Sequence, residues 1–145
     1  MDPRQTGLLE QYSSLEYILL GDLSDILEEP DDAESRKWML AVLDTLLDTL
    51  PREFVLKEED GYMAEVLERY PSWSTQVDRL HRDHDQLFAK LKELRSLIER
   101  NNQLAPIAAE VRRDLRGWIL TLTNHHRSET RLMQTAMNLE VGTGD

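Results

Sequence analysis

The chain has 145 residues, with 28 acidic and 17 basic side chains, a formal net charge of -11 and no cysteine. A surface this acidic repels phosphate backbones, so nucleic acid is excluded as a natural partner. The absence of cysteine excludes disulfides, thiolate nucleophiles, iron–sulfur clusters and cysteine-bound zinc. Any bound metal must therefore be held by His, Asp or Glu, a set of donors that suits iron, manganese or zinc.

Length and hydropathy predict one domain, over residues 1–145, that lies outside the membrane. A chain of this size can bury one continuous core but not two. No apolar run approaches the roughly 20 residues that span a bilayer, and the first residues, MDPRQTG, lack the apolar stretch of a signal peptide. We therefore expect a cytoplasmic protein that contacts no membrane.

Four stretches have apolar side chains spaced by three and four residues, which predicts amphipathic helices. The first covers about residues 5–29, and the second begins near Asp32, whose carboxylate can cap it. Their apolar stripes consist of Leu8, Tyr12, Leu15, Leu19, Leu23 and Ile26, and of Trp38, Val42, Leu46 and Leu50. Because proline removes a backbone donor, Pro51 predicts a kink or a restart before residues 54–69 continue as helix.

The third and fourth stretches contain polar residues within their apolar stripes. The third stripe is Trp73, Val77, Leu80, His84, Leu87, Leu91, Leu94 and Ile98, and the fourth is Ile107, Val111, Leu115, Trp118, Leu122, His125, Glu129, Leu132 and Ala136. The fourth stretch continues to an ending at Gly142 to Gly144. Short polar connections between the four stretches favour an all-α fold, an antiparallel up-down-up-down four-helix bundle.

His84, His125 and Glu129 are predicted to meet inside this bundle. A helix advances about 100° per residue, so His84 shares a face with the leucines around it, and His125 and Glu129 share the inner face of the last helix. Both histidines lie near the middle of their helices, so antiparallel packing brings them to one level. A buried glutamate without a cation or donors is costly, which favours a metal site. The alternative is a set of hydrogen-bonded polar residues in the core.

Three further residues are weaker candidates. His81 lies at the edge of the third stripe, and His126 is about 100° around the helix from His125, facing a neighbouring helix or water. Glu58 follows Phe54 by four residues, which turns it inward although acidic runs are usually solvated. The sequence contains no Gly-rich phosphate loop, no nucleophile elbow and no H-E-x-x-H helix, so we predict no enzyme.

Three segments together resemble the hemerythrin-like (HHE cation-binding) family of four-helix bundles. They are FVLKEEDGYM at 54–63, LHRDHDQL at 80–87 and LTNHHRSE at 122–129. Members of this family hold a non-haem di-iron centre with histidines and bridging carboxylates. The resemblance implies that His84, His125 and Glu129 are metal ligands, with Glu58 and His126 as further candidates.

The chain departs from the family pattern on its first two helices. Glu53 stands where the family has a histidine, and Lys57 stands where a carboxylate is expected. The first helix has no histidine, and Tyr17 or Leu19 aligns with its ligand position. The chain is therefore expected to be a degenerate member, with two hypotheses for its function. In the first, the chain is a metal-binding domain that holds iron, mono- or dinuclear, or zinc, and its role is the handling of dioxygen, nitric oxide or iron. In the second, it is a metal-free bundle that serves as a protein-interaction or structural module.

Overall fold

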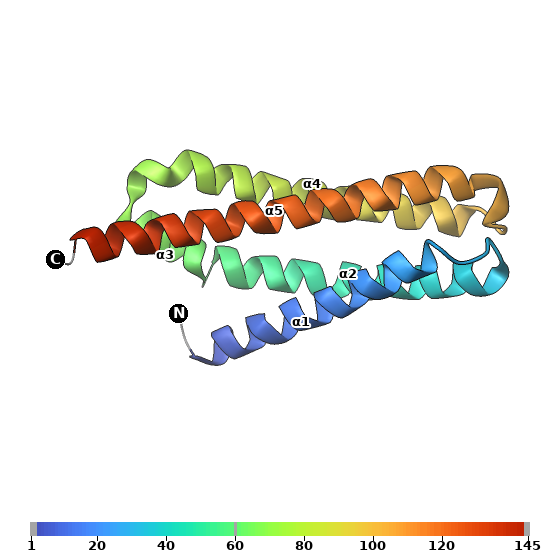
Figure 1. The fold of residues 1–145 in the computed structure, drawn as a ribbon, viewed down its shortest axis with the longest axis horizontal. Helices are drawn as coiled ribbons and strands as arrows, with labels where there is room; N and C mark the ends of the chain where they lie inside the picture. Colours follow the sequence, from blue (N-terminus) through green and yellow to red (C-terminus); the bar gives the residue numbers. More distant parts are fainter. Residues whose placement is uncertain (1–2, 60, 144–145) are drawn as a thin grey trace.

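The computed structural model describes residues 3–59 and 61–143, and these form an all-α bundle without a strand (Figure 1). Four long helices make up the bundle: α1 (Pro3–Ile26), α2 (Ala33–Glu58), α4 (Ser74–Arg100) and α5 (Ala108–Thr143). The short helix α3 (Tyr62–Arg69) and the 3-10 turns η1 (Pro71–Trp73) and η2 (Ala105–Ile107) lie in the connections. The predicted antiparallel four-helix bundle is confirmed. Within the described part of the chain, no helix combines the length and the apolar character needed to cross a bilayer.

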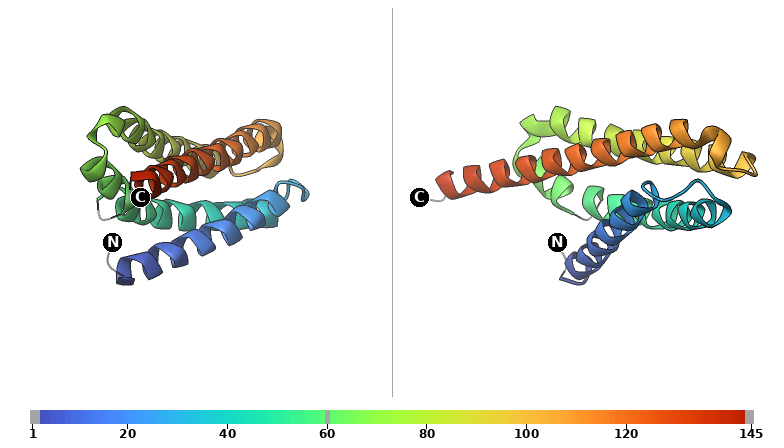
Figure 2. Two further views of the ribbon diagram at one scale, coloured as in Figure 1. Left: turned by 60° about the vertical axis from the view of Figure 1, so that its left-hand side comes forward. Right: turned by 45° about the vertical axis from the view of Figure 1, so that its right-hand side comes forward.

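The four helices differ in how extensively they contact one another. Helix α2 packs against α1 and α4, and α4 packs against α5, whereas α1 and α5 make few contacts with each other. Figures 1 and 2 show α1 inclined relative to the other helices, with its N-terminal end leaning away from the bundle. The predicted stripe of α1 is therefore buried only in its second half, at Leu19, Leu23 and Ile26, while Leu8 is exposed. One side of the bundle, between α1 and α5, remains open.

The stripes predicted for α4 and α5 form the core almost without exception. From Val77 to Ile98, every predicted stripe residue of α4 is buried, including His84. Trp118 of α5 is buried as well, and its indole Nε1 donates a hydrogen bond of 2.9 Å to the carbonyl of Leu87. On α2 the prediction was wrong at Trp38, which is half exposed, because the neighbouring Met39 occupies the inward position instead.

Of the kink or restart predicted at Pro51, the restart is wrong, because helix α2 continues through this residue to Glu58. Leu50 and Phe54 are both buried on the inner face, and their burial outweighs the loss of one backbone hydrogen bond. Helix α2 ends instead at Glu58, and α3 begins at Tyr62. A Cβ added to Gly61 would lie 2.7 Å from the Cα of Lys57, so this close approach of two backbone segments requires glycine.

Hydrogen bonds that involve three side chains fix the end of the bundle that lies away from α3. Asp32 accepts from the backbone N–H of Ser35 at 2.9 Å, which confirms the predicted cap of α2. Arg36 of α2 donates to three carbonyls at the C-terminal end of α4. Arg112 of α5 donates to two carbonyls that follow α1 and pairs with Asp31. These contacts set the axial level of the helices and hence of the polar residues in their inner faces.

Candidate metal centre

His84, His125 and Glu129 meet in the interior, where α4 and α5 face each other. The ring centroids of the two histidines are 4.6 Å apart, and all three side chains are buried. Glu129 Oε1 lies 2.7 Å from His125 Nε2 and 3.6 Å from His84 Nε2. Each of the three residues offers one ligand-type atom, and these atoms lie within 4.8 Å of one another. Two imidazole nitrogens therefore converge on one carboxylate.

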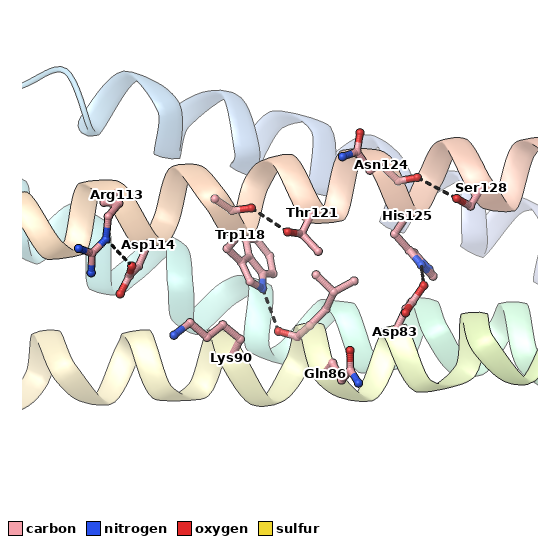
Figure 3. Close-up of a pocket in the computed structure, with 12 residues that line it drawn as sticks. Asp83, Gln86, Lys90, Arg113, Asp114, Trp118, Thr121, Asn124, His125 and Ser128 are labelled. Atoms are coloured by element: carbon pink, nitrogen blue, oxygen red, sulfur yellow. Dashed lines mark hydrogen bonds and ion pairs between the residues drawn. The ribbon is translucent and has the colours of Figure 1, made fainter.

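The outer nitrogen of each imidazole is held by another carboxylate. His84 Nδ1 lies 2.6 Å from Glu58 Oε1, and His125 Nδ1 lies 3.2 Å from Asp83 Oδ2 (Figure 3). An imidazole that donates from Nδ1 presents the lone pair of Nε2 on its other edge. Neither Nε2 has a hydrogen-bond partner among the described residues. His125 Nε2 is close to Glu129 but is not aligned for a hydrogen bond, so both lone pairs face the same small space.

Helix α2 fixes the orientation of the His84 ring. Phe54 stacks on it, with ring centroids 3.8 Å apart and planes within 4° of parallel. Glu58, one turn further along α2, contacts His84 and also His81, whose Nδ1 lies 3.0 Å from the same oxygen. The side chain of His81 is 39% exposed, so it lies at the outer margin of the cluster. The ring plane and the Nδ1 hydrogen bond together leave His84 Nε2 one direction in which to point.

Lys57 and Tyr62 approach Glu129 from the other side. Lys57 Nζ lies 3.3 Å from Glu129 Oε1 and 3.2 Å from Oε2, and the Tyr62 hydroxyl donates to Oε2. The same ammonium lies 3.3 Å from Glu53 Oε1, one turn before it on α2. Lys57 and Glu53 are both buried. A positive charge is thus enclosed in the bundle between two carboxylates.

The contacts of Glu129 and Lys57 favour their charged forms despite burial, whereas burial raises the pKa of Glu53. Burial by itself would raise the pKa of Glu129, but the hydrogen-bonding and charged groups around it, among them His126 and the Lys57 ammonium, outweigh burial and lower that pKa. Burial would lower the pKa of Lys57, yet the carboxylates of Glu129 and Glu53 raise it overall. The pKa of Tyr62 is raised, first by burial and then by the Glu129 carboxylate, so its hydroxyl stays protonated as a donor.

A second group of ligand-type atoms, from Glu16, Glu53 and His126, lies next to the first. These atoms are within 4.8 Å of one another. His126 Nε2 is 2.9 Å from Glu16 Oε2, and His126 Nδ1 is 3.4 Å from Glu129 Oε1. Burial opposes protonation of His126, but the hydrogen bonds to Glu129 and Glu16 raise its pKa to about 9. The His126 side chain is thus directed at Glu16 of α1, with 30% of its surface still exposed.

Glu16 is the residue of α1 that sequence reasoning missed. The alignment of Tyr17 with a ligand position is wrong, because Tyr17 is 82% exposed, and Leu19 belongs to the apolar core. Glu16 precedes Leu19 by three residues and Leu23 by seven, so its helical spacing could have identified it. Tyr62 was also missed as a donor, because its position in the sequence predicted only packing.

A groove of about 900 Å³ leads to this charged interior along the open side between α1 and α5. Its lining includes Glu16, Glu53, Lys57, Tyr62, His126 and Glu129, together with apolar residues of α1 and α5. A separate pocket of about 660 Å³ lies on the α4–α5 face and includes His125 and Asp83 (Figure 3). His125 therefore borders solvent-filled space on its Nδ1 edge, whereas Glu129 is reached from the groove.

An antiparallel four-helix bundle with histidines and carboxylates on facing inner surfaces has the architecture of a helical cation-binding protein. The family model for the hemerythrin HHE cation binding domain matches residues 18–136. The chain belongs to this family, as the resemblance of its three segments implied. Comparisons with curated proteins and with solved structures gave no match. The matched range includes His84, His125 and Glu129 and begins two residues after Glu16.

Proposed function

We propose that the chain binds one metal ion, iron in the first instance and zinc as the alternative, through His84, His125 and Glu129. The observation that carries this proposal is the pair of buried Nε2 atoms without hydrogen-bond partners, both directed at one ionised carboxylate. Metal–ligand bonds of 2.0–2.2 Å in tetrahedral geometry place donor atoms about 3.4 Å apart. The separations of 2.7 and 3.6 Å from Glu129 lie on either side of that value. Two imidazoles and one carboxylate are also a donor set typical of non-haem iron and of zinc.

In this proposal Glu58 and Asp83 orient the ligands. Each accepts from the Nδ1 of one histidine, which fixes the tautomer and makes Nε2 a better donor to a cation. Glu58, a candidate ligand from the sequence, takes this orienting role because its contact is with the edge of His84 opposite to Nε2. His126, the other additional candidate, is engaged by Glu16 and borders the site through its contact with Glu129.

An iron ion with three protein ligands keeps coordination positions for dioxygen or nitric oxide, and this supports a role in oxygen, nitric oxide or iron handling. The groove between α1 and α5 supplies a route for a small molecule toward Glu129. Tyr62 and Lys57 hold the Glu129 carboxylate from the groove side. We propose binding or sensing of such a molecule as this role.

A metal-free role is the second candidate, and one observation favours it. Glu129 is already paired by the Lys57 ammonium and the Tyr62 hydroxyl, so its charge is compensated without a metal. In that case the bundle acts through contacts with another protein. Tyr17 and Ile18, which are exposed on α1 beside the groove, provide apolar surface for such contacts.

Metal content distinguishes the two candidates. Protein purified without a polyhistidine tag is dialysed against ferrous iron under anaerobic conditions, and in parallel against zinc, and the bound metal per chain is measured. We expect one ion, and at a free concentration of 100 times Kd we expect stabilisation by about 2.7 kcal/mol. His125→Ala should abolish both effects, and His81→Ala, a change at the half-exposed margin, should preserve them. If no stoichiometric metal and no thermal shift are found, the metal-binding proposal fails and the metal-free role remains.

A further inference from the structure

The Lys57 ammonium lies between the two groups of ligand-type atoms. It contacts Glu129, which belongs to the group with His84 and His125, and Glu53, which belongs to the group with Glu16. Its distances to the two carboxylates are nearly equal, at 3.2 and 3.3 Å for the closest oxygens. The ammonium therefore bridges the two groups as a shared counter-ion.

Burial makes this position unusual for a lysine. Lys57 is 6% exposed, and lysine is almost never so buried unless a carboxylate neutralises it. Glu16, Glu53 and Glu129 all line the inner part of the groove between α1 and α5, and each is at most 5% exposed. Without a cation, three buried carboxylates would repel one another strongly. The bundle needs positive charge at this point, and the side chain of Lys57 on α2 supplies it.

The same ammonium restricts what else can bind. A divalent cation held by Glu53 would lie beside a fixed positive charge that shares its ligand, and like charges at such separations in a poorly hydrated interior repel strongly. Lys57 lies equally close to Glu129 in the first group, at 3.3 Å from Oε1, but that group also has two imidazole Nε2 atoms without hydrogen-bond partners. In the second group the single imidazole, His126, is engaged by Glu16 through its Nε2. The two groups thus differ in their capacity for a metal ion.

We propose that the Lys57 ammonium serves as the second cation of the centre, so that each chain holds one metal ion and not two. The inference rests on the proposed function for the first ion. It further assigns Glu16, Glu53 and His126 to a latent site that accepts a second divalent cation once the ammonium is removed. The lysine is then the residue that sets the metal stoichiometry.

The experiment measures iron per chain by anaerobic equilibrium dialysis against ferrous iron, followed by elemental analysis. Wild type should bind one ion, and Lys57→Glu, which replaces the ammonium by a carboxylate, should bind two. Lys57→Gln, which removes only the charge, should also gain a second ion, with weaker affinity. Adding Glu16→Gln to Lys57→Glu should return the number to one. Lys37→Glu makes the same change of charge at an exposed position of α2 and should leave one ion bound.

The outcomes separate this inference from the proposed function. Wild type without stoichiometric iron contradicts the proposed function itself. Wild type with one ion and both Lys57 variants with one ion leaves that function intact and overturns the role of Lys57. Wild type with two ions also overturns it. If circular dichroism shows that neither Lys57 variant folds even in the presence of ferrous iron, the inference fails, since a second ion should replace the lost ammonium.

Discussion

Replacement of His84 by leucine should abolish metal binding and leave the stability of the metal-free protein nearly unchanged. His84 is 2% exposed and stacks on Phe54, so an apolar side chain of similar size suits its surroundings. Two free-energy terms of similar size oppose each other. Removing Nε2, which has no hydrogen-bond partner, relieves about 1–3 kcal/mol of desolvation cost. Losing the hydrogen bond to the Glu58 side chain costs about 1.5–3 kcal/mol.

The expected free energy of unfolding without metal therefore lies within about 2 kcal/mol of the wild-type value. Leu91→Ala is the matched control, because Leu91 is fully buried two turns further along α4. It should cost about 2–5 kcal/mol through the cavity it leaves, while the metal ligands remain in place.

Urea unfolding followed by far-UV circular dichroism, with a chelator and then with ferrous iron under anaerobic conditions, measures both quantities. His84→Leu should unfold at the same urea concentration in both buffers, whereas Leu91→Ala should be stabilised by iron as much as wild type is. A His84→Leu variant that keeps the full iron-induced stabilisation would refute the assignment of His84 as a ligand. If His84→Leu lowers the free energy of unfolding without metal by more than about 4 kcal/mol, the desolvation of Nε2 and the hydrogen bond to Glu58 do not offset each other as argued.

Substitutions of Asp32 and Arg112 test contacts at the far end of the bundle, and a substitution of Tyr62 tests a contact of the centre. Asp32→Ala should lower the melting temperature by a few degrees at neutral pH. Hydrogen bonds to the first turn of α2 lower the pKa of Asp32, so the difference in melting temperature between wild type and Asp32→Ala should shrink as the pH falls from the ordinary value of 3.8 through the lower folded pKa. The difference in melting temperature between Asp32→Asn and Asp32→Ala should not depend on pH in this range. Arg112→Ala should cost about 1–2 kcal/mol in urea unfolding, whereas Arg113→Ala, at an exposed position, should change stability by less than about 0.5 kcal/mol. Tyr62→Phe should destabilise the metal-free protein by about 1–3 kcal/mol, because Glu129 loses a donor, and an unchanged unfolding midpoint would exclude that hydrogen bond.

The sequence pattern predicted the buried residues correctly where local periodicity and tertiary packing agree. On α4 and α5 the stripes run without interruption, and antiparallel packing then places His84 opposite His125 as predicted. The pattern failed where packing overrides it. Pro51 by itself predicts a break in the helix, yet the burial of Phe54 keeps α2 continuous. Leu8 has the right spacing for the core but is 40% exposed, in the N-terminal half of α1.

The charged half of the centre was harder to predict, because a charged residue at helical spacing is usually taken to face solvent. Glu16 and Glu53 are buried only because Lys57 and His126 lie within reach on other turns and helices. Such compensation depends on contacts between residues far apart in the chain. Lys57 was recognised as a departure from the family pattern, but its bridging position between two carboxylates is visible only in three dimensions.

Helix α1 is attached to the bundle on one side only, through α2, and this bears on the kinetics of ion exchange. The proposed ligands all come from α4 and α5, whereas α1 contacts chiefly α2 and covers the polar interior from one side. Outward movement of α1 would hydrate Glu16 and Glu53 and leave the ligand helices packed. An ion could then be loaded or released through partial opening of the native state, at a free-energy cost well below that of global unfolding. Residence time in the centre would be governed by the hinge between α1 and α2, which Arg112 secures.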